Sequence, residues 1–136
     1  MSIQLLEAFG AAWNAHDLEA LLSMVTDDCV FETAAGAEVF GNRFVGKDAL
    51  REAFPVAWIT WPDSQWAGAV HYVLGDRGVS EWTFLGTDRN GKRTEVRGVD
   101  LFELRGGIDR SKRYLPQSEK SLVICPNQFI KPNDLN

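Results

Sequence analysis

The chain has 136 residues, of which 45% are hydrophobic and 24% charged, and 14 Lys and Arg against 19 Asp and Glu give a net charge of −5. This composition is typical of one folded domain with its own hydrophobic core and excludes a disordered chain. The acidic balance, interrupted only by a short basic cluster at residues 110–113, argues against nucleic acid as a partner.

Two cysteines, Cys29 and Cys125, lie far apart, and neither has a second Cys or His at metal-ligand spacing. We therefore expect reduced thiols and no metal site, and the lack of a phosphate-binding glycine loop implies no cofactor. The N-terminus enters an amphipathic pattern at once, and no stretch approaches the roughly 18 apolar residues of a membrane span. These features predict a cytoplasmic protein with no membrane contact.

Two helices are predicted at the N-terminus. Apolar residues recur at helical spacing over residues 3–13, and the pattern stops at residues 14–16. A second amphipathic segment covers residues 18–25. Asp17 directly precedes it and is a better candidate for the N-cap of this helix than for a catalytic residue.

The next segment alternates between strand and loop signals. A short strand is expected at residues 29–33, followed by a turn-rich loop that runs through Gly41 and Asn42. Long loops inside a small domain often border binding sites. A third helix begins at Lys47, and Pro55 complicates its continuation toward Trp58, so its end is left open.

From there the pattern becomes that of an antiparallel sheet. Three strands are predicted at residues 65–74, 79–87 and 93–105, joined by turns at 75–78 and 88–91.

The register of these strands decides which polar residues meet. If Asp76 and Arg77 form a two-residue turn, His71 lies opposite Trp82 on one face of the sheet. Asp100 comes beside Trp82 only if the second turn is bulged or has an odd number of residues.

Asp100 is the first candidate catalytic residue. Alternation along the third strand places it on the apolar face together with Val96 and Phe102. A carboxylate in such surroundings must be paired or lose its charge. The alternatives are a structural carboxylate bonded to backbone, or a strand that faces the other way. His71 is the second candidate, and its alternative is a core histidine satisfied by backbone or by a tyrosine hydroxyl.

The order of elements resembles the nuclear transport factor 2-like superfamily, which includes SnoaL-like polyketide cyclases and ketosteroid isomerases. The resemblance rests on the segments AWNAHDLEA (12–20), TDDCVFE (26–32), GNRFVG (41–46) and VDLFELR (99–105). It is strongest to the SnoaL-like group, in which GVSEWTF (78–84) has a familiar form. Residues 1–115 would then form a SnoaL-like α+β domain, and residues 116–136 an extension of unknown role.

This resemblance implies a cone-shaped α+β fold. A strongly bent antiparallel or mixed sheet would wrap around the N-terminal helices and enclose a deep apolar cavity, and the protein would assemble as a homodimer. In the extension, the apolar run at residues 122–125 could add an edge strand, lie across a partner subunit or stay poorly ordered.

The catalytic residues of the relatives are only partly present. Asp100 resembles the protonated aspartic acid that donates to the oxyanion in ketosteroid isomerase. The positions similar to the catalytic tyrosine and the carboxylate base hold Phe9 and Thr33, so isomerisation by that mechanism is not expected. Where SnoaL-like cyclases have an aspartate on the last strand, this chain has Lys112 and Arg113. The resemblance thus implies a pocket more firmly than a reaction.

The expected pocket is an aromatic cage around Asp100 and His71. Its predicted ligand-binding residues are Trp13, Phe31, Thr33, Phe44, Trp58, Trp82, Phe84 and Tyr114. Phe54 is a further candidate, but for Phe54 and Trp58 a place in the core is the better interpretation.

Such a cage suits a small, largely apolar cyclic or aromatic molecule. Asp100 would donate a proton to it and His71 would accept one, in chemistry of the isomerase, cyclase or hydrolase type. The alternative is a non-catalytic module that binds a ligand or dimerises through the outward sheet face. That face would carry Tyr72, Leu85, Val99 and Leu101, interleaved with Glu81, Arg97 and Glu103.

Overall fold

The structure is a computed structural model that describes residues 3–39, 41–104 and 122–124. Its elements in chain order are α1 (Ile3–Asn14), α2 (Leu18–Ser23), β1 (Val30–Glu38), β2 (Gly41–Val45), α3 (Lys47–Ala53), α4 (Val56–Thr60), β3 (Gln65–Leu74), β4 (Arg77–Thr87), β5 (Arg93–Leu104) and β6 (Leu122–Ile124). The fold is therefore α+β, as predicted. None of the helices in the described ranges has the length and apolarity needed to cross a membrane.

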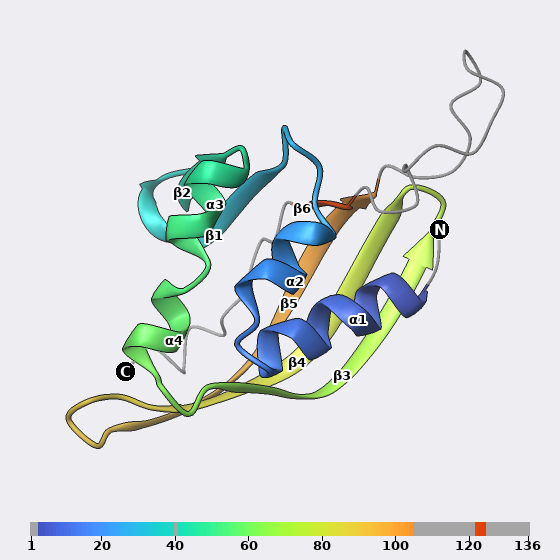
Figure 1. Ribbon diagram of the computed structural model, residues 1–136. Coiled ribbons are helices and arrows are strands. Elements are labelled where there is room, and N and C mark those ends of the chain that lie inside the picture. The colour runs from blue at the N-terminus through green and yellow to red at the C-terminus, as the bar shows by residue number, and fades with distance from the viewer. Residues whose placement is uncertain (1–2, 40, 105–121, 125–136) are drawn as a thin grey trace, which may run out of the picture.

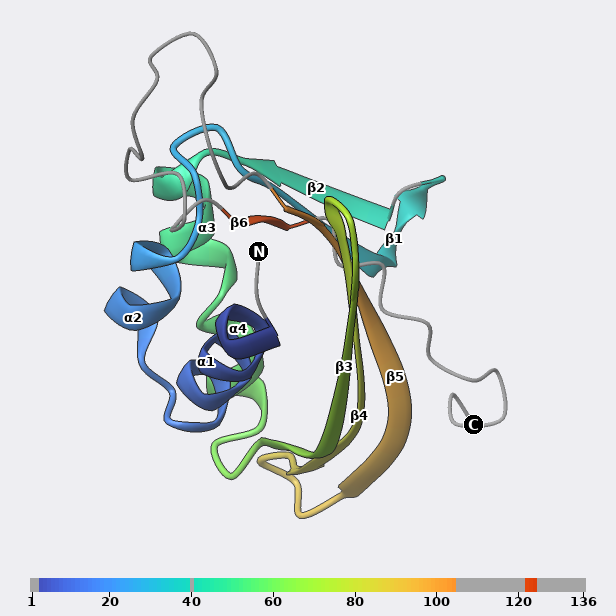
Figure 2. The ribbon, with the colours of Figure 1, turned by 90° about the vertical axis from the view of Figure 1, so that its right-hand side faces the viewer.

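The strands form two antiparallel sheets, one of β1 and β2 and one in the order β3-β4-β5-β6. α1 lies across the larger sheet (Figure 1). Seen edge-on, this sheet curves, and all four helices lie on its concave side (Figure 2). The bent antiparallel sheet was predicted, but within the described residues the two sheets stay separate and do not close into a cone.

The helix boundaries follow the local signals closely. α1 ends at Asn14, and the Ala20 N–H donates to Asp17 Oδ1 at 3.1 Å, which confirms Asp17 as the cap of α2. α2 is shorter than predicted and ends at Ser23. Pro55 separates α3 from α4 because its ring nitrogen has no hydrogen to continue the first helix.

The loop predicted after residue 33 is instead a β-hairpin. β1 continues to Glu38, β2 begins at Gly41, and Phe31 pairs with Phe44 across the two strands. The prediction was wrong because hydrogen bonds from the partner strand outweigh the weak local preference of small residues for a loop. An irregularity in the register between Thr33 and Glu38 accommodates the small residues.

The first turn of the larger sheet is shifted by one residue from the prediction. Leu74 pairs with Arg77, so the turn consists of Gly75 and Asp76. Gly75 has a φ of 59°, which a glycine adopts readily at the first central position of a type II′ turn. His71 consequently pairs with Ser80 rather than Trp82. The slip amounts to two residues in register, so His71 keeps its predicted face.

A β-bulge interrupts β3 in its middle. Gly68, with a φ of 63°, and Ala69 together lie opposite Trp82. The extra residue reverses the alternation of the strand. As a result Trp66 and His71, which would face opposite sides of a regular strand, both pair with residues of the concave face.

The second turn has an odd length, which was the condition for Asp100 to lie beside Trp82. Thr87 pairs with Arg93, which leaves five residues in the turn. This register places Asp100 opposite Ser80, with Trp82 next along the same face. The alternation predicted for β5 is thereby confirmed.

Most buried apolar side chains lie between the helices, β1 and the end of β5. This main core consists of Leu6, Phe9, Ala12, Leu21, Leu22, Val25, Cys29, Phe31, Leu50, Phe54 and Phe102. A smaller cluster at the other end of the sheet combines Trp82, Phe84 and Val96 with the half-buried Trp61 and Trp66. Burial raises the pKa of the Cys29 thiol to about 11, so it is an unreactive core residue.

The predicted C-terminal extension contributes to the sheet. Residues 122–124 form β6, which pairs with the end of β5 and brings Ile124 opposite Phe102. Of the three alternatives for this segment, the edge strand is the one observed. Cys125 and the remainder of the extension lie outside the described residues.

Candidate functional site

A cavity of about 360 Å³ lies between α1 and the bulged middle of the sheet. Its lining residues are Leu6, Glu7, Phe9, Gly10, Ala11 and Asn14 from α1, Trp66, Ala67, Gly68, Ala69 and His71 from β3, Ser80 and Trp82 from β4, and Phe102 from β5. The volume falls within the roughly 300–1,000 Å³ of small-molecule sites, and the walls are mainly apolar.

Asn14 fixes one end of this cavity. Its Nδ2 donates to the Trp66 carbonyl at 3.1 Å, and its Oδ1 accepts from the Trp66 N–H at 2.7 Å. The side-chain amide therefore acts like one residue of a neighbouring strand and holds the end of α1 against β3. His16 lies outside the cavity lining, with Nε2 2.9 Å from the Ser64 carbonyl oxygen and its ring stacked on Trp58.

Three polar residues form a row across the sheet beneath α1. His71 pairs with Ser80, and Ser80 in turn pairs with Asp100, so the three lie on adjacent strands at the same level. His71 Nδ1 is 2.7 Å from Ser80 Oγ. Ser80 is only 4% exposed. The register thus places His71 and Asp100 at one level of the sheet, on the two strands that flank Ser80.

Trp82 lies beside this row and is held from two sides. Its Nε1–H donates to Asp100 Oδ2 at 3.1 Å. Its ring covers Gly98, where an added Cβ would lie only 2.4 Å from the indole Cη2. Trp82 lines the cavity, whereas Asp100 is not among the lining residues described.

His71 is the titratable group of the row that reaches the cavity. Burial lowers its pKa, and the negative charge of Glu7 on α1 opposes this effect more weakly. The imidazole is therefore neutral at pH 7 and can accept a proton. Its ring faces α1 at Gly10, where a Cβ would lie 3.9 Å from His71 Cε1.

The other aromatic residues predicted for the pocket lie outside the lining of this cavity. Trp13 and Trp58 pack against one another in the aromatic part of the main core, with Phe54 on the other side of Trp13. Phe31 and Phe44 stack on each other across the small hairpin.

Two further predicted residues are placed by the structure and one is not. Phe84 packs against Trp61 and Trp66 at 5.1 and 5.2 Å between ring centroids. Thr33 Oγ1 accepts a long hydrogen bond of 3.4 Å from the Asn42 N–H. Tyr114 lies outside the described residues.

Sequence reasoning missed three contributors to the site. No role was predicted for Ser80, because its partner His71 was registered against Trp82. Asn14 was taken only as the end of a helix. The bulge at Gly68 was missed, although a glycine inside a strand pattern is a recognised signal of a bulge.

In the described part of the chain, no three His, Cys, Asp or Glu side chains gather closely enough to hold a metal ion. The chemistry available in the cavity wall is that of the His71 imidazole, the Ser80 hydroxyl and the Glu7 carboxylate. The Asp100 carboxylate lies next to them, bonded to Trp82.

Residues 6–108 match the family described as the SnoaL-like domain, so the chain belongs to this family. The match covers both the helical layer and the strands that frame the cavity. Among curated proteins, no sequence matches the chain.

Solved structures confirm the fold at low sequence identity. A protein with a ketosteroid isomerase-like fold from Catenulispora acidiphila, in complex with trimethylamine, has a TM-score of 0.75 and 14% identity, over 98% of this chain and 90% of its own. TerC, co-crystallised with polyporic acid, has a TM-score of 0.74 and 16% identity over 98% and 93%. A candidate polyketide cyclase from Pseudomonas putida has a TM-score of 0.73 and 19% identity over 96% and 92%.

Proposed function

We propose that the cavity binds a small, largely apolar cyclic or aromatic molecule. The observation that carries this proposal is the cavity itself, where mainly apolar walls surround a single histidine–serine pair. Apolar walls supply binding free energy through buried area, and a few fixed polar groups orient a ligand.

The family supports a ligand of this general kind. Two of the similar structures hold a small organic molecule, trimethylamine in one and polyporic acid in the other. These two compounds differ in size and charge. They support a small-molecule site in this fold and leave the compound to be found by experiment.

We further propose acid–base chemistry of the isomerase, cyclase or hydrolase type, centred on His71 and Asp100. A neutral imidazole in the cavity wall is suited to accept a proton from a bound molecule. Asp100 lies two strands away in the same row, where its carboxylate would stabilise the imidazolium that results.

A ligand screen tests the binding proposal. Steroids, terpenoids, aromatic polyketides and small lactones are compared by the shift in melting temperature that each causes. A compound present at about 100 times its dissociation constant adds about 2.7 kcal/mol to the free energy of unfolding, which corresponds to several degrees. The shift should weaken strongly in His71→Ala, which alters the cavity wall.

The second histidine provides a matched control. His16 bonds to Ser64 outside the cavity lining, and its φ of 55° is one that asparagine tolerates. His16→Asn should lower the melting temperature of the free protein while keeping the ligand-induced shift. If no compound stabilises the wild type, the binding proposal fails and a dimerisation module becomes the better description.

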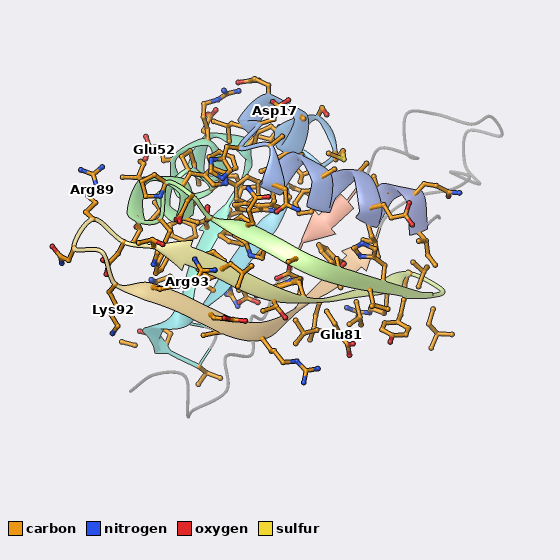
Figure 3. The ribbon with its side chains drawn as sticks, turned by 90° about the horizontal axis from the view of Figure 1, so that it is seen from below. Asp17, Glu52, Glu81, Arg89, Lys92 and Arg93 are labelled. Carbon is orange, nitrogen blue, oxygen red and sulfur yellow. The ribbon has the colours of Figure 1, made fainter. Side chains whose placement is uncertain are left out.

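We also propose that the protein is a homodimer joined through the convex face of the larger sheet. In the described ranges all helices lie on the opposite face, and Figure 3 shows Glu81 pointing away from them. Tyr72 on this convex face is 53% exposed, and Val99 and Leu101 follow on β5. Apolar residues mixed with charged ones are typical of such interfaces.

Sedimentation tests this assembly. Wild type at micromolar concentration should sediment at twice the 15.2 kDa mass of the chain. Leu101→Glu should shift it to the monomer. Val45→Glu, at an exposed apolar position on β2, should remain dimeric. A wild type that sediments as a monomer would refute the proposal.

A further inference from the structure

Glu7 brings a negative charge to the cavity wall. It lies on the face of α1 that also carries Gly10, Ala11 and Asn14, since residues three, four and seven positions apart lie on one side of a helix. An added Cβ at Gly10 would lie 3.9 Å from His71 Cε1. Glu7 is thus about one turn of helix away from the point where α1 meets the imidazole, and its charge acts on His71. The carboxylate and the imidazole belong to the same end of the cavity.

The polar groups at the other end of the cavity are engaged with one another. Asn14 follows Glu7 by two turns, or about 10 Å along the helix axis. Its Nδ2 donates to the Trp66 carbonyl, and its Oδ1 accepts from the Trp66 N–H. A ligand therefore meets an amide that is already bonded near Asn14 and a charged carboxylate near Glu7. The cavity has one charged end.

The groups around Glu7 favour a positive charge. Burial lowers the pKa of His71, so the imidazole is neutral at pH 7 and does not repel a cation. Trp66 and Trp82 line the cavity, and the negative face of an indole ring attracts cations. The positively polarised N–H of Trp82 donates to Asp100, which is not a lining residue. The net charge of −5 adds a long-range attraction for cations.

We propose that Glu7 selects the ligand by its charge, and that the ligand is a protonated amine attached to an apolar ring. The ring packs against the aromatic wall, and the ammonium group pairs with the Glu7 carboxylate at the His71 end. This inference rests on the proposed function, because it names the class of molecule that the same cavity binds. A neutral ligand gains no ion pair there, and an ionised carboxylic acid is repelled by Glu7.

The exposure of Glu7 sets the size of the effect. Its side chain is exposed, so an ion pair with it stays in contact with water and contributes modestly. A cation beside an indole ring adds a similar amount. Together these contributions predict that an amine binds about 3- to 10-fold more tightly than a neutral molecule of the same shape. Glu7 decides specificity, whereas the apolar walls supply most of the affinity.

Matched triplets of compounds test the inference by isothermal titration calorimetry near neutral pH. The first triplet is naphthylmethylamine, naphthalenemethanol and naphthoate, all substituted at the same ring carbon, which are cationic, neutral and anionic. The second is cyclohexylmethylamine, cyclohexylmethanol and cyclohexanecarboxylate, which repeats the comparison on a ring without π electrons. In the wild type the amine of each triplet should bind most tightly and the carboxylate most weakly.

Three variants assign the preference to Glu7. Glu7→Gln keeps the size of the side chain and removes its charge, so the preference for amine over alcohol should fall about 2- to 5-fold. Glu7→Lys should reverse the order and make the carboxylate bind more tightly than the amine. Glu52→Gln, at an exposed position on α3 outside the cavity lining, is the matched control and should keep the wild-type preference. Unchanged melting temperatures of the free variants confirm that the fold is retained.

Two outcomes would overturn the inference. In one, the wild type binds the alcohol at least as tightly as the amine. In the other, the preference for the amine is the same in Glu7→Gln as in the wild type. Both leave the proposed function standing, because the cavity would still bind an apolar ring. If no member of either triplet binds, the proposed function fails and the inference fails with it.

Discussion

Two regions beneath the helices contain the same kinds of aromatic side chain, yet one is solid and the other is hollow. In the main core, Trp13 meets Phe54 at 5.0 Å and Trp58 at 5.4 Å between ring centroids, edge to face. In the cavity, Trp82 lies against Gly98 and opposite the bulge at Gly68. Trp82 therefore meets glycine where the core tryptophans meet other aromatic rings.

The two regions should also differ in what they contribute. Interlocked rings in the core gain dispersion and burial, so their value lies in stability. Around the cavity, parts of α1 and β3 lack such contacts, so this region contributes less to stability than the core does. Substitutions in the core should therefore affect unfolding, and substitutions around the cavity should affect ligand binding. The following predictions test this contrast, from the largest expected effect to the smallest.

Phe54→Ala should have the largest effect on stability. Phe54 is 1% exposed and packs against Phe9, Trp13 and Phe31, so its removal leaves a void that the surrounding rings cannot fill. We expect a loss of about 3–5 kcal/mol in the free energy of unfolding, measured by urea denaturation. Ile59→Ala, at an exposed position on α4, should change it by less than about 0.5 kcal/mol.

Gly98→Ala should be destabilising, although alanine is a larger apolar residue. Its Cβ would overlap the Trp82 ring and force the indole away from Asp100. The expected loss is about 1–3 kcal/mol by the same measurement. Arg97→Ala, on the convex face of the same strand, is the control. Equal stability of Gly98→Ala and wild type would contradict the packing described for Trp82.

Gly10→Ala separates stability from binding in a single variant. Gly10 lies inside α1, where alanine has the higher helix propensity, and the new Cβ would make an ordinary contact of 3.9 Å with His71 Cε1. We expect a gain of about 0.5–1 kcal/mol in unfolding free energy. The added methyl group narrows the cavity, so the ligand-induced melting shift should decrease. A loss of stability would break the contrast between the two regions.

The pH dependence of His71 should be the smallest effect. Its pKa is lowered in the folded state by burial, so protonation favours the unfolded chain. Stability should be fully present above the unfolded pKa of about 6.5 and decrease as the pH falls toward the folded pKa. Denaturation of wild type and His71→Gln between pH 7.5 and 5.5 isolates this contribution by difference. A difference that does not change with pH would show that His71 is not desolvated.

Local patterns predicted much of the fold correctly. The ends of α1, the cap at Asp17 and the alternation of β5 around Asp100 all depend on neighbours in the sequence. Such features involve short-range hydrogen bonds and a fixed period of side chains, which one chain segment sets by itself. The length of the turn between β4 and β5 was left open, with an odd or bulged turn as the condition for Asp100 to lie beside Trp82.

The site was harder to predict because it depends on register between segments far apart in the sequence. A turn displaced by one residue gave His71 the wrong partner, and the bulge at Gly68 was not foreseen. Each error changes which side chains meet, although the strands β3, β4 and β5 were themselves predicted. Aromatic residues expected in the pocket, such as Trp13 and Phe31, have the same hydrophobicity in a core as in a cavity wall.

The sequence by itself therefore determined the α+β class, the SnoaL-like resemblance and the face on which His71 and Asp100 lie. Only the tertiary structure decided that Ser80 stands between them and that the cavity opens along Gly10 and Gly68. The physical reason is that the sheet face on which a side chain lies follows from the alternation of side chains along its own strand. Which side chains meet, in contrast, depends on how three strands pair. Turn lengths and one extra residue in a strand can change that pairing without any change in composition.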